Sequence, residues 1–175
     1  QDKVSPAIDV LFSVVDIDAF NKALGTSASD AGIAIWTTTP WTLPANMAVC
    51  LHPELDYVAV EFNNSVLLLA EALYQTVLAR FGVENTEDVK VLGRCKGRDL
   101  ELVKLQHPIY ERQVPVVLGE HVTTDAGTGA VHTAPGHGQD DFVVGQRYGL
   151  DVYNPVGSNG VYLPGTELFE GQHVF

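Results

Sequence analysis

The segment YVAVEFNNSVLLL, residues 57–69, decides the fold class of this chain. Two short runs of β-branched, aromatic and aliphatic residues, 57–62 and 66–69, are typical of strands. Between them lies Asn63-Asn64, and asparagine tolerates the positive φ angles that a tight hairpin turn requires. The segment therefore predicts an antiparallel β-hairpin.

Other short strands surround this hairpin. Working outward, we expect strands over 8–15, 33–38, 47–51, 89–92, 100–105 and 114–118, and over 152–154 and 161–163 on either side of a turn at 158–160. Helical spacing of apolar residues appears only over 71–81 and 140–148, and each helix is followed by a glycine, Gly82 or Gly149. Many short strands with two helices indicate a β-rich α+β fold, a partly closed β-barrel with peripheral helices.

The composition fits one globular domain over residues 1–175, with 46% hydrophobic and 18% charged residues. No apolar run reaches the ~18 residues of a membrane span, and no signal peptide opens the chain, so we expect a cytoplasmic protein. Cys50 and Cys95 stand apart without zinc-ligand spacing, which favours buried free thiols. The only methionine is Met47, and the chain starts with Gln1. We expect a piece excised from a longer protein.

The charge balance is strongly acidic, with 10 basic against 22 acidic residues and a net charge of −12. This argues against sequence-blind binding to nucleic acid, for which a basic surface is expected. One segment is locally basic, and its cations are a candidate contact for tRNA phosphates: Lys90, Arg94, Lys96 and Arg98. The alternative is that alternating charges mark the solvated face of a strand pair.

The stretch WTTTPWTLPAN, residues 36–46, places three threonines at the end of an expected strand. Each hydroxyl donates one hydrogen bond and accepts two, so such a row can hold an ester carbonyl, a ribose hydroxyl or a water. Pro40 and Pro44 restrict the loop and would pre-position these groups. An ordinary strand followed by a packed Pro-Trp turn has the same pattern.

The stretch DAGTGAVHTAPGHGQDDF, residues 125–142, combines four glycines and a proline, which lets a ligand approach the backbone. The pair Gly127 and Gly129 lacks the third glycine and the strand–helix setting of a dinucleotide site. Polar side chains crowd the entrance of the following helix: His132, His137, Asp140 and Asp141. Each alone fits a plain structural role, such as a helix cap. Because both stretches follow expected strands, they predict a shared pocket.

These two stretches resemble the editing domain of bacterial-type isoleucyl-tRNA synthetases. The similarity extends to SPAIDV at 5–10, HPELDY at 52–57 and NPVGSNGVYLPGT at 154–166. The related valyl and leucyl enzymes are expected to carry arginine where this chain has Thr39. The resemblance implies the editing-domain fold shared by the valyl, isoleucyl and leucyl enzymes. It also implies deacylation without aminoacylation, because HIGH-like and KMSKS-like motifs are absent.

The resemblance implies that this domain hydrolyses the ester of valine wrongly attached to isoleucine tRNA, and that valyl-adenylate is a further substrate. Asp141 matches the aspartate that holds the α-ammonium, and His132 matches the size-limiting wall. Thr38 and Thr39 match the residues around the ester and terminal adenosine. The substrate-binding set is completed by Thr37, Trp41, Asn46 and Gly129. No metal or cofactor is implied. The partners are the tRNA 3′ end and the rest of the synthetase, and the chain is expected to be a monomer.

Three alternatives stay open at the level of sequence. A metal-dependent hydrolase would use His132, His137, Asp140 and Asp141, but histidines five residues apart on a Gly-Pro loop do not share a helix face. A non-catalytic domain would only bind the tRNA acceptor end. A free-standing deacylase would clear mischarged tRNA without a parent enzyme.

Overall fold

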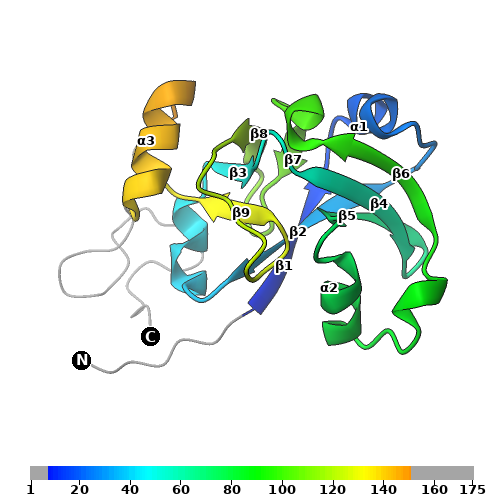
Figure 1. Ribbon diagram of the computed structural model, residues 1–175. Coiled ribbons are helices and arrows are strands. Elements are labelled where there is room, and N and C mark those ends of the chain that lie inside the picture. The colour runs from blue at the N-terminus through cyan, green and yellow to red at the C-terminus, as the bar shows by residue number, and fades with distance from the viewer. Residues whose placement is uncertain (1–7, 151–175) are drawn as a thin grey trace.

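The computed structural model of the chain describes residues 8–150 (Figure 1). Within this range three α-helices accompany nine strands in one mixed sheet, in the order β6-β4-β5-β2-β1-β7-β8-β3-β9. The strands are β1 (Ile8–Val14), β2 (Ala31–Thr37), β3 (Ala48–Leu51), β4 (Asp56–Phe62), β5 (Ser65–Ala70), β6 (Val91–Lys96), β7 (Lys104–Gln106), β8 (Gln113–Leu118) and β9 (Ala130–Thr133). The helices are α1 (Ile17–Leu24), α2 (Tyr74–Arg80) and α3 (Gln139–Tyr148), with 3₁₀ turns η1 (Pro40–Ala45), η2 (Thr86–Asp88) and η3 (Gly97–Leu100).

The predicted hairpin is confirmed as β4 and β5, which pair antiparallel with Phe62 opposite Ser65. Asn63 and Asn64 adopt φ angles of 51° and 63°, the left-handed conformation that the turn demands. Tyr57 and most of the apolar residues of both strands are buried in the main core. This hairpin anchors the sheet because its apolar side chains are removed from water on folding.

The sheet bends so that its far strand β9 packs across β2, although the two are not paired by a ladder. Thr128, just before β9, makes the link. Its hydroxyl donates to the Ala34 carbonyl (2.6 Å), and its own carbonyl accepts from the Ala70 amide (3.0 Å). The expected β-rich α+β fold is confirmed. The ladder over residues 8–150 does not close on itself, however, so a partly closed barrel is too strong a description.

Several expected elements shift. The helix expected at 71–81 begins only at Tyr74, and the strand expected at 100–105 shortens to β7, because Leu102 has φ +68° and interrupts it. Helix α1 and strand β9 were not predicted. Both are short, and the glycines around β9 mask its strand character. The strands expected at 152–154 and 161–163 lie outside the described residues.

The helices flank the bent sheet at different places (Figure 1). Helix α3 stands beside β8 and β3 and buries Val144 against them, whereas α1 lies near β6. No helix within residues 8–150 is both long and apolar enough to cross a membrane. The end of β2, the turn η1, strand β9 and the start of α3 thus gather on one side of the molecule.

Candidate functional site

A cavity of about 210 Å³ lies where β2 ends, between η1, β9 and the first turn of α3. It is smaller than the roughly 300–1,000 Å³ of drug-sized ligand pockets, which suits a small group such as an aminoacyl end. Six residues singled out in the sequence line it: Thr37, Thr38, Thr39, His132, His137 and Asp141. The other lining residues are Trp36, Thr42 and Val131. The structure therefore brings the two polar stretches, some ninety residues apart, to one place.

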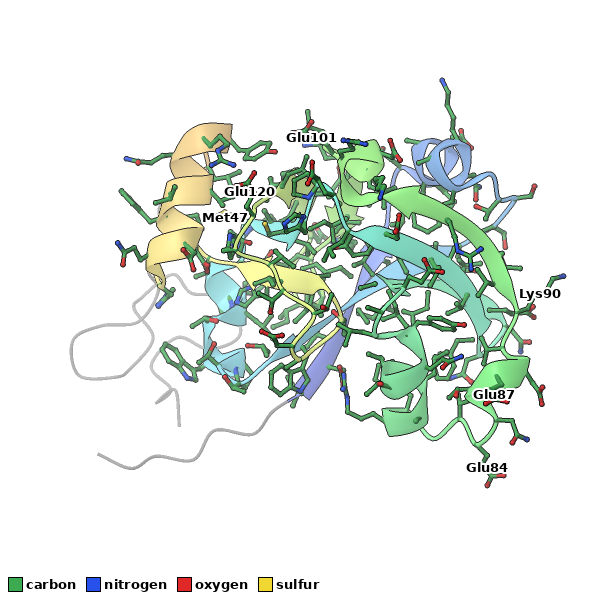
Figure 2. The ribbon with its side chains drawn as sticks, viewed as in Figure 1. Met47, Glu84, Glu87, Lys90, Glu101 and Glu120 are labelled. Atoms are coloured by element: carbon green, nitrogen blue, oxygen red, sulfur yellow. The ribbon has the colours of Figure 1, made fainter. Side chains whose placement is uncertain are left out.

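Strand pairing explains how the two stretches meet. Strand β3, which follows η1 directly, pairs antiparallel with β9 so that Val49 lies opposite His132 and Ala48 opposite Thr133. The Met47 amide extends this pairing with a hydrogen bond to the Thr133 carbonyl (2.9 Å). Met47 is labelled in Figure 2, close to α3 and β9. The threonine turn is consequently held against the histidine strand by backbone hydrogen bonds.

The threonine row is partly organised by its own hydroxyls. The Thr39 amide donates to Thr37 Oγ1 (3.0 Å), and the two hydroxyl oxygens are 3.3 Å apart. Thr37 is buried, while Thr38 and Thr39 are exposed at the cavity. The exposed hydroxyls remain available to a ligand because the buried one fixes the turn.

His132 is held at both ring nitrogens. The Asn46 amide donates to its Nδ1 (2.5 Å) and to the Ala48 carbonyl (2.9 Å), so Nδ1 accepts and Nε2 carries the proton. Nε2 then donates to the Thr42 hydroxyl (2.7 Å), which donates onward to the Thr39 carbonyl (2.8 Å). Burial lowers the pKa of His132 to about 4, so the ring is neutral at pH 7. It forms a fixed, uncharged part of the cavity wall.

Thr42 was not predicted from the sequence as a site residue, whereas Asn46 was predicted to bind the substrate. Asn46 is fully buried and stands behind His132, so it supports the wall and does not line the cavity. Thr42 is the residue that both lines the cavity and orients His132. Its only signal in the sequence is its position three residues after Thr39, where it resembles an ordinary turn residue.

Asp141 lies in the first turn of α3 and points back toward β9, where its Oδ2 accepts from the Ala134 amide (2.9 Å). Burial raises the pKa of this carboxyl above its ordinary 3.8. The Ala134 hydrogen bond and His121 oppose the shift, and Asp140 adds to it. A cation placed beside Asp141 would offset this cost. The carboxylate thus stands at the cavity as an acceptor for a positively charged group.

His137 lines the same cavity from the turn that precedes α3. Its ring meets Trp41 edge to face, with centroids 5.7 Å apart, and its Nε2 is buried without a hydrogen-bond partner. Burial lowers the pKa of His137, and nearby Asp141 opposes that shift. Trp41, expected to bind substrate, contacts His137 and is not among the residues that line the cavity.

Gly129 was also expected to bind the substrate, and in the structure it has a packing role. Its φ is +84°, and a Cβ there would come within 2.4 Å of the Ala70 Cβ. Its carbonyl accepts a hydrogen bond from the Tyr57 hydroxyl (2.5 Å). The glycine is required for the close approach of β9 to β4 and β5, and it does not line the cavity.

The basic residues proposed to contact tRNA lie on and around β6, apart from the cavity. Lys90 projects at the end of the molecule remote from α3, near Glu84 and Glu87 (Figure 2). Arg94 pairs with Glu71 (2.7 Å) and Lys96 with Asp56 (2.9 Å), while Arg98 is exposed in η3. The structure does not bring these cations to the cavity, and two of them are already paired with carboxylates.

The turn η1 is also held from behind by the loop between β7 and β8. His107 Nε2 donates to the Leu43 carbonyl (2.7 Å), since its Nδ1 accepts from two backbone amides. Arg112 donates to the carbonyls of Pro44 (3.1 Å) and Asn46 (2.7 Å). This support was not predicted from the sequence.

A metal site does not fit His132. Both nitrogens of His132 are engaged by protein groups, which leaves no lone pair for an ion. Among residues 8–150 no group of three or more His, Cys, Asp or Glu side chains is arranged to hold a metal.

Comparison with known proteins identifies the family of the chain. The sequence profile of the family described as "Leucyl-tRNA synthetase, editing domain" matches residues 23–163. Isoleucine–tRNA ligases from Alkalilimnicola ehrlichii and Shewanella sediminis are 58% and 56% identical over the whole chain. The chain spans 19% of the length of each of these curated relatives.

Solved structures share the fold. The cytosolic leucyl-tRNA synthetase editing domain of P. knowlesi superposes with a TM-score of 0.67 at 17% identity, covering 81% of this chain and 61% of that one. The corresponding P. falciparum domain gives a TM-score of 0.63 at 15% identity, covering 78% and 63%. The chain therefore belongs to the family of aminoacyl-tRNA synthetase editing domains, and over its whole length it is similar to isoleucine–tRNA ligases.

Proposed function

We propose that this domain hydrolyses the ester bond of valyl-tRNA(Ile), and the acyl-phosphate anhydride bond of valyl-adenylate in the same cavity. The observation that carries the proposal is the meeting of Asp141, the exposed Thr38 and Thr39, and the fixed ring of His132 around about 210 Å³. A cation acceptor, a set of hydroxyls and a rigid wall are what an aminoacyl ester requires. Its partners in this proposal are the tRNA 3′ end and the remainder of the synthetase. The domain acts in the cytoplasm as a monomer.

The proposed geometry assigns each group a task. The carboxylate of Asp141 accepts charge-assisted hydrogen bonds from the α-ammonium of the substrate. The hydroxyls of Thr38 and Thr39 orient the ester and the ribose, so that a water attacks a positioned carbonyl carbon. An aminoacyl ester is already activated, so no covalent intermediate on the protein is required.

His132 supplies the selectivity in this proposal. A hydrophobic pocket separates isoleucine from valine by only ~1–3 kcal/mol, a limit for which isoleucyl-tRNA synthetase is itself the standard example and which we take as given. A second cavity therefore has to exclude isoleucine by size. A ring fixed at both nitrogens is suited to this because it cannot swing aside to admit one more methylene.

The test compares Asp141→Ala with Asp140→Ala in the full synthetase. Asp140 is the matched control, since it is adjacent, exposed and absent from the cavity lining. Asp141→Ala should abolish deacylation of valyl-tRNA(Ile) and let it accumulate, with isoleucine charging unchanged, whereas Asp140→Ala should behave as the wild type. Binding of the tRNA end without hydrolysis by the wild type would instead indicate a non-catalytic domain.

A further inference from the structure

Hydrolysis of an ester requires a group that accepts the proton of the attacking water. This inference rests on the proposed function and deepens it by asking which residue does so. Three titratable side chains line the cavity: His132, His137 and Asp141. Their hydrogen bonds differ enough to separate them.

His132 has no nitrogen to offer. Its Nδ1 accepts from Asn46, and its Nε2 proton is donated to Thr42. Accepting a proton from water would require breaking one of these buried hydrogen bonds, which costs ~1–3 kcal/mol for the group left unsatisfied. His132 therefore serves as a wall.

The carboxylate of Asp141 is also occupied by partners in the proposed complex. One carboxylate oxygen accepts from the Ala134 amide, and in the proposed complex the other faces the α-ammonium. A carboxylate paired with a cation holds a proton poorly, so it is a weak base at neutral pH.

His137 is different, because its side chain makes no hydrogen bond to the described residues. Its Nε2 is shielded from solvent without a hydrogen-bond partner, as are Asn46 Oδ1 and His121 Nε2, and of these three residues only His137 lines the cavity. The ring is held in place by Trp41, and its backbone amide donates to the Ala134 carbonyl (2.9 Å). Since Asp141 holds the Ala134 amide, one short turn couples the ring to the carboxylate.

We propose that the His137 imidazole is the general base of the deacylation. The accepting nitrogen is Nδ1, because Nε2 is shielded from solvent. Unprotonated Nδ1 takes a proton from water while the water oxygen bonds to the ester carbonyl carbon. The bond between that carbon and the ribose oxygen then breaks, and the ribose oxygen leaves with the proton returned by the imidazolium. The products are valine, whose carboxylic acid releases its proton to solvent, and tRNA with its terminal hydroxyl restored.

Burial favours a neutral His137 ring at pH 7 in spite of the nearby carboxylate. The titratable groups facing His137 are Asp141 from α3 and His132 from β9, and the latter is uncharged. Desolvation outweighs the attraction of Asp141, so the pKa of His137 lies below its ordinary 6.5. Deacylation should therefore fall as the pH drops through this lowered pKa, since the imidazolium accepts no proton.

The experiment uses the full synthetase with His137→Ala, His137→Gln and, as matched control, His52→Ala, whose ring caps the amide of Glu54 in the β3–β4 turn. In single-turnover deacylation of valyl-tRNA(Ile), both His137 variants should lose about 10²–10⁴-fold in rate with the half-saturating enzyme concentration nearly unchanged. Added imidazole should restore part of the rate to His137→Ala only. The acid limb of the pH profile should vanish in both variants and persist in His52→Ala.

Two results would overturn the assignment: an unchanged rate in both His137 variants, or weaker binding at an unchanged maximal rate. Retained isoleucine charging and an unchanged thermal midpoint establish that the variants are folded. Asp141→Ala, measured alongside, separates the two claims. If the wild type does not hydrolyse valyl-tRNA(Ile), the proposed function fails. If the wild type is active, Asp141→Ala is inactive and the His137 variants remain active, only the base assignment fails.

Discussion

The hydroxyl of Thr42 lies between the Nε2 proton of His132 and the carbonyl of Thr39, so one side chain fixes the wall of the cavity. Thr42→Val preserves volume but removes that acceptor, leaving a buried N–H unsatisfied at a cost of ~1–3 kcal/mol. The ring of His132 should then loosen and admit isoleucine. We expect the full synthetase to gain hydrolysis of isoleucyl-tRNA(Ile), with discrimination reduced by up to about 10–200-fold.

Thr42→Ser is the control for this substitution, because it keeps the hydroxyl that the ring requires. Discrimination should stay close to wild type in that variant, measured as the ratio of kcat/KM for the valyl and isoleucyl esters. Full rejection of isoleucine by Thr42→Val would show that the orientation of His132 does not determine the size limit.

The carboxylate of Asp141 destabilises the empty domain. Because its folded pKa lies above 3.8, the folded state binds its proton more tightly than the unfolded state. The free energy of unfolding therefore decreases as pH rises through the folded pKa, and the deficit is complete above it. Asp141→Asn can still accept from the Ala134 amide but carries no charge. Deacylation should be lost, while the thermal midpoint at about pH 8 should equal or exceed that of the wild type.

The same comparison at about pH 4 provides the internal control. There the difference in thermal midpoint between Asp141→Asn and the wild type should be smaller. A midpoint well below wild type at about pH 8 would mean that the charge is compensated in the free domain. The stability cost assigned to Asp141 would then be wrong.

At the scale of elements, the docking of β9 depends on one crowded glycine. Gly129 and Gly25 both have positive φ, at +84° and +69°. A Cβ at Gly129 would meet Ala70 at 2.4 Å, whereas one at Gly25 has nothing within 4 Å. Gly25→Ala should cost only the left-handed backbone penalty of ~1–2 kcal/mol, and Gly129→Ala should add a further ~1–3 kcal/mol of overpacking.

Chemical denaturation of the two variants measures this difference directly. Equal losses of unfolding free energy in Gly25→Ala and Gly129→Ala would mean that Ala70 and its strand move aside without cost. In that case the contact between β9 and the hairpin would not fix the position of His132.

Local signals in the sequence predicted part of this fold and long-range pairing decided the rest. The Asn63-Asn64 turn was predictable because it depends on the φ preference of two residues. Strand β9 was not, because four residues among glycines form a strand only through their pairing with β3. The same pairing places Asn46 behind His132, a position that no pattern within residues 36–46 indicates. The lining role of the threonines and Asp141 followed from the resemblance, but that of Thr42 did not.

At the scale of the whole molecule, the charge of −12 opposes binding of a polyanion. Tight binding to RNA draws on counterion release by lysine and arginine. Here Arg94 and Lys96 on β6 are instead paired with carboxylates. The chain spans only 19% of the length of its relatives. On the proposed function, we therefore expect the cavity to lie in this domain and most of the affinity for tRNA to lie in the remainder of the synthetase.

This division predicts how the isolated chain behaves. On valyl-tRNA(Ile) its KM should exceed that of the full synthetase by about 10²–10⁴-fold, because tethering the substrate elsewhere raises its effective concentration at the cavity. The kcat values should agree within a few-fold, since the lining residues are the same.

Valyl-adenosine is the control, because it has no remote RNA to bind. The isolated chain and the full synthetase should hydrolyse it with similar kcat/KM. Added salt should raise the KM of the synthetase for valyl-tRNA(Ile) steeply and that of the chain little, because an acidic domain has few phosphate contacts to lose. Equal KM values would place the tRNA-binding surface on this domain, despite its charge.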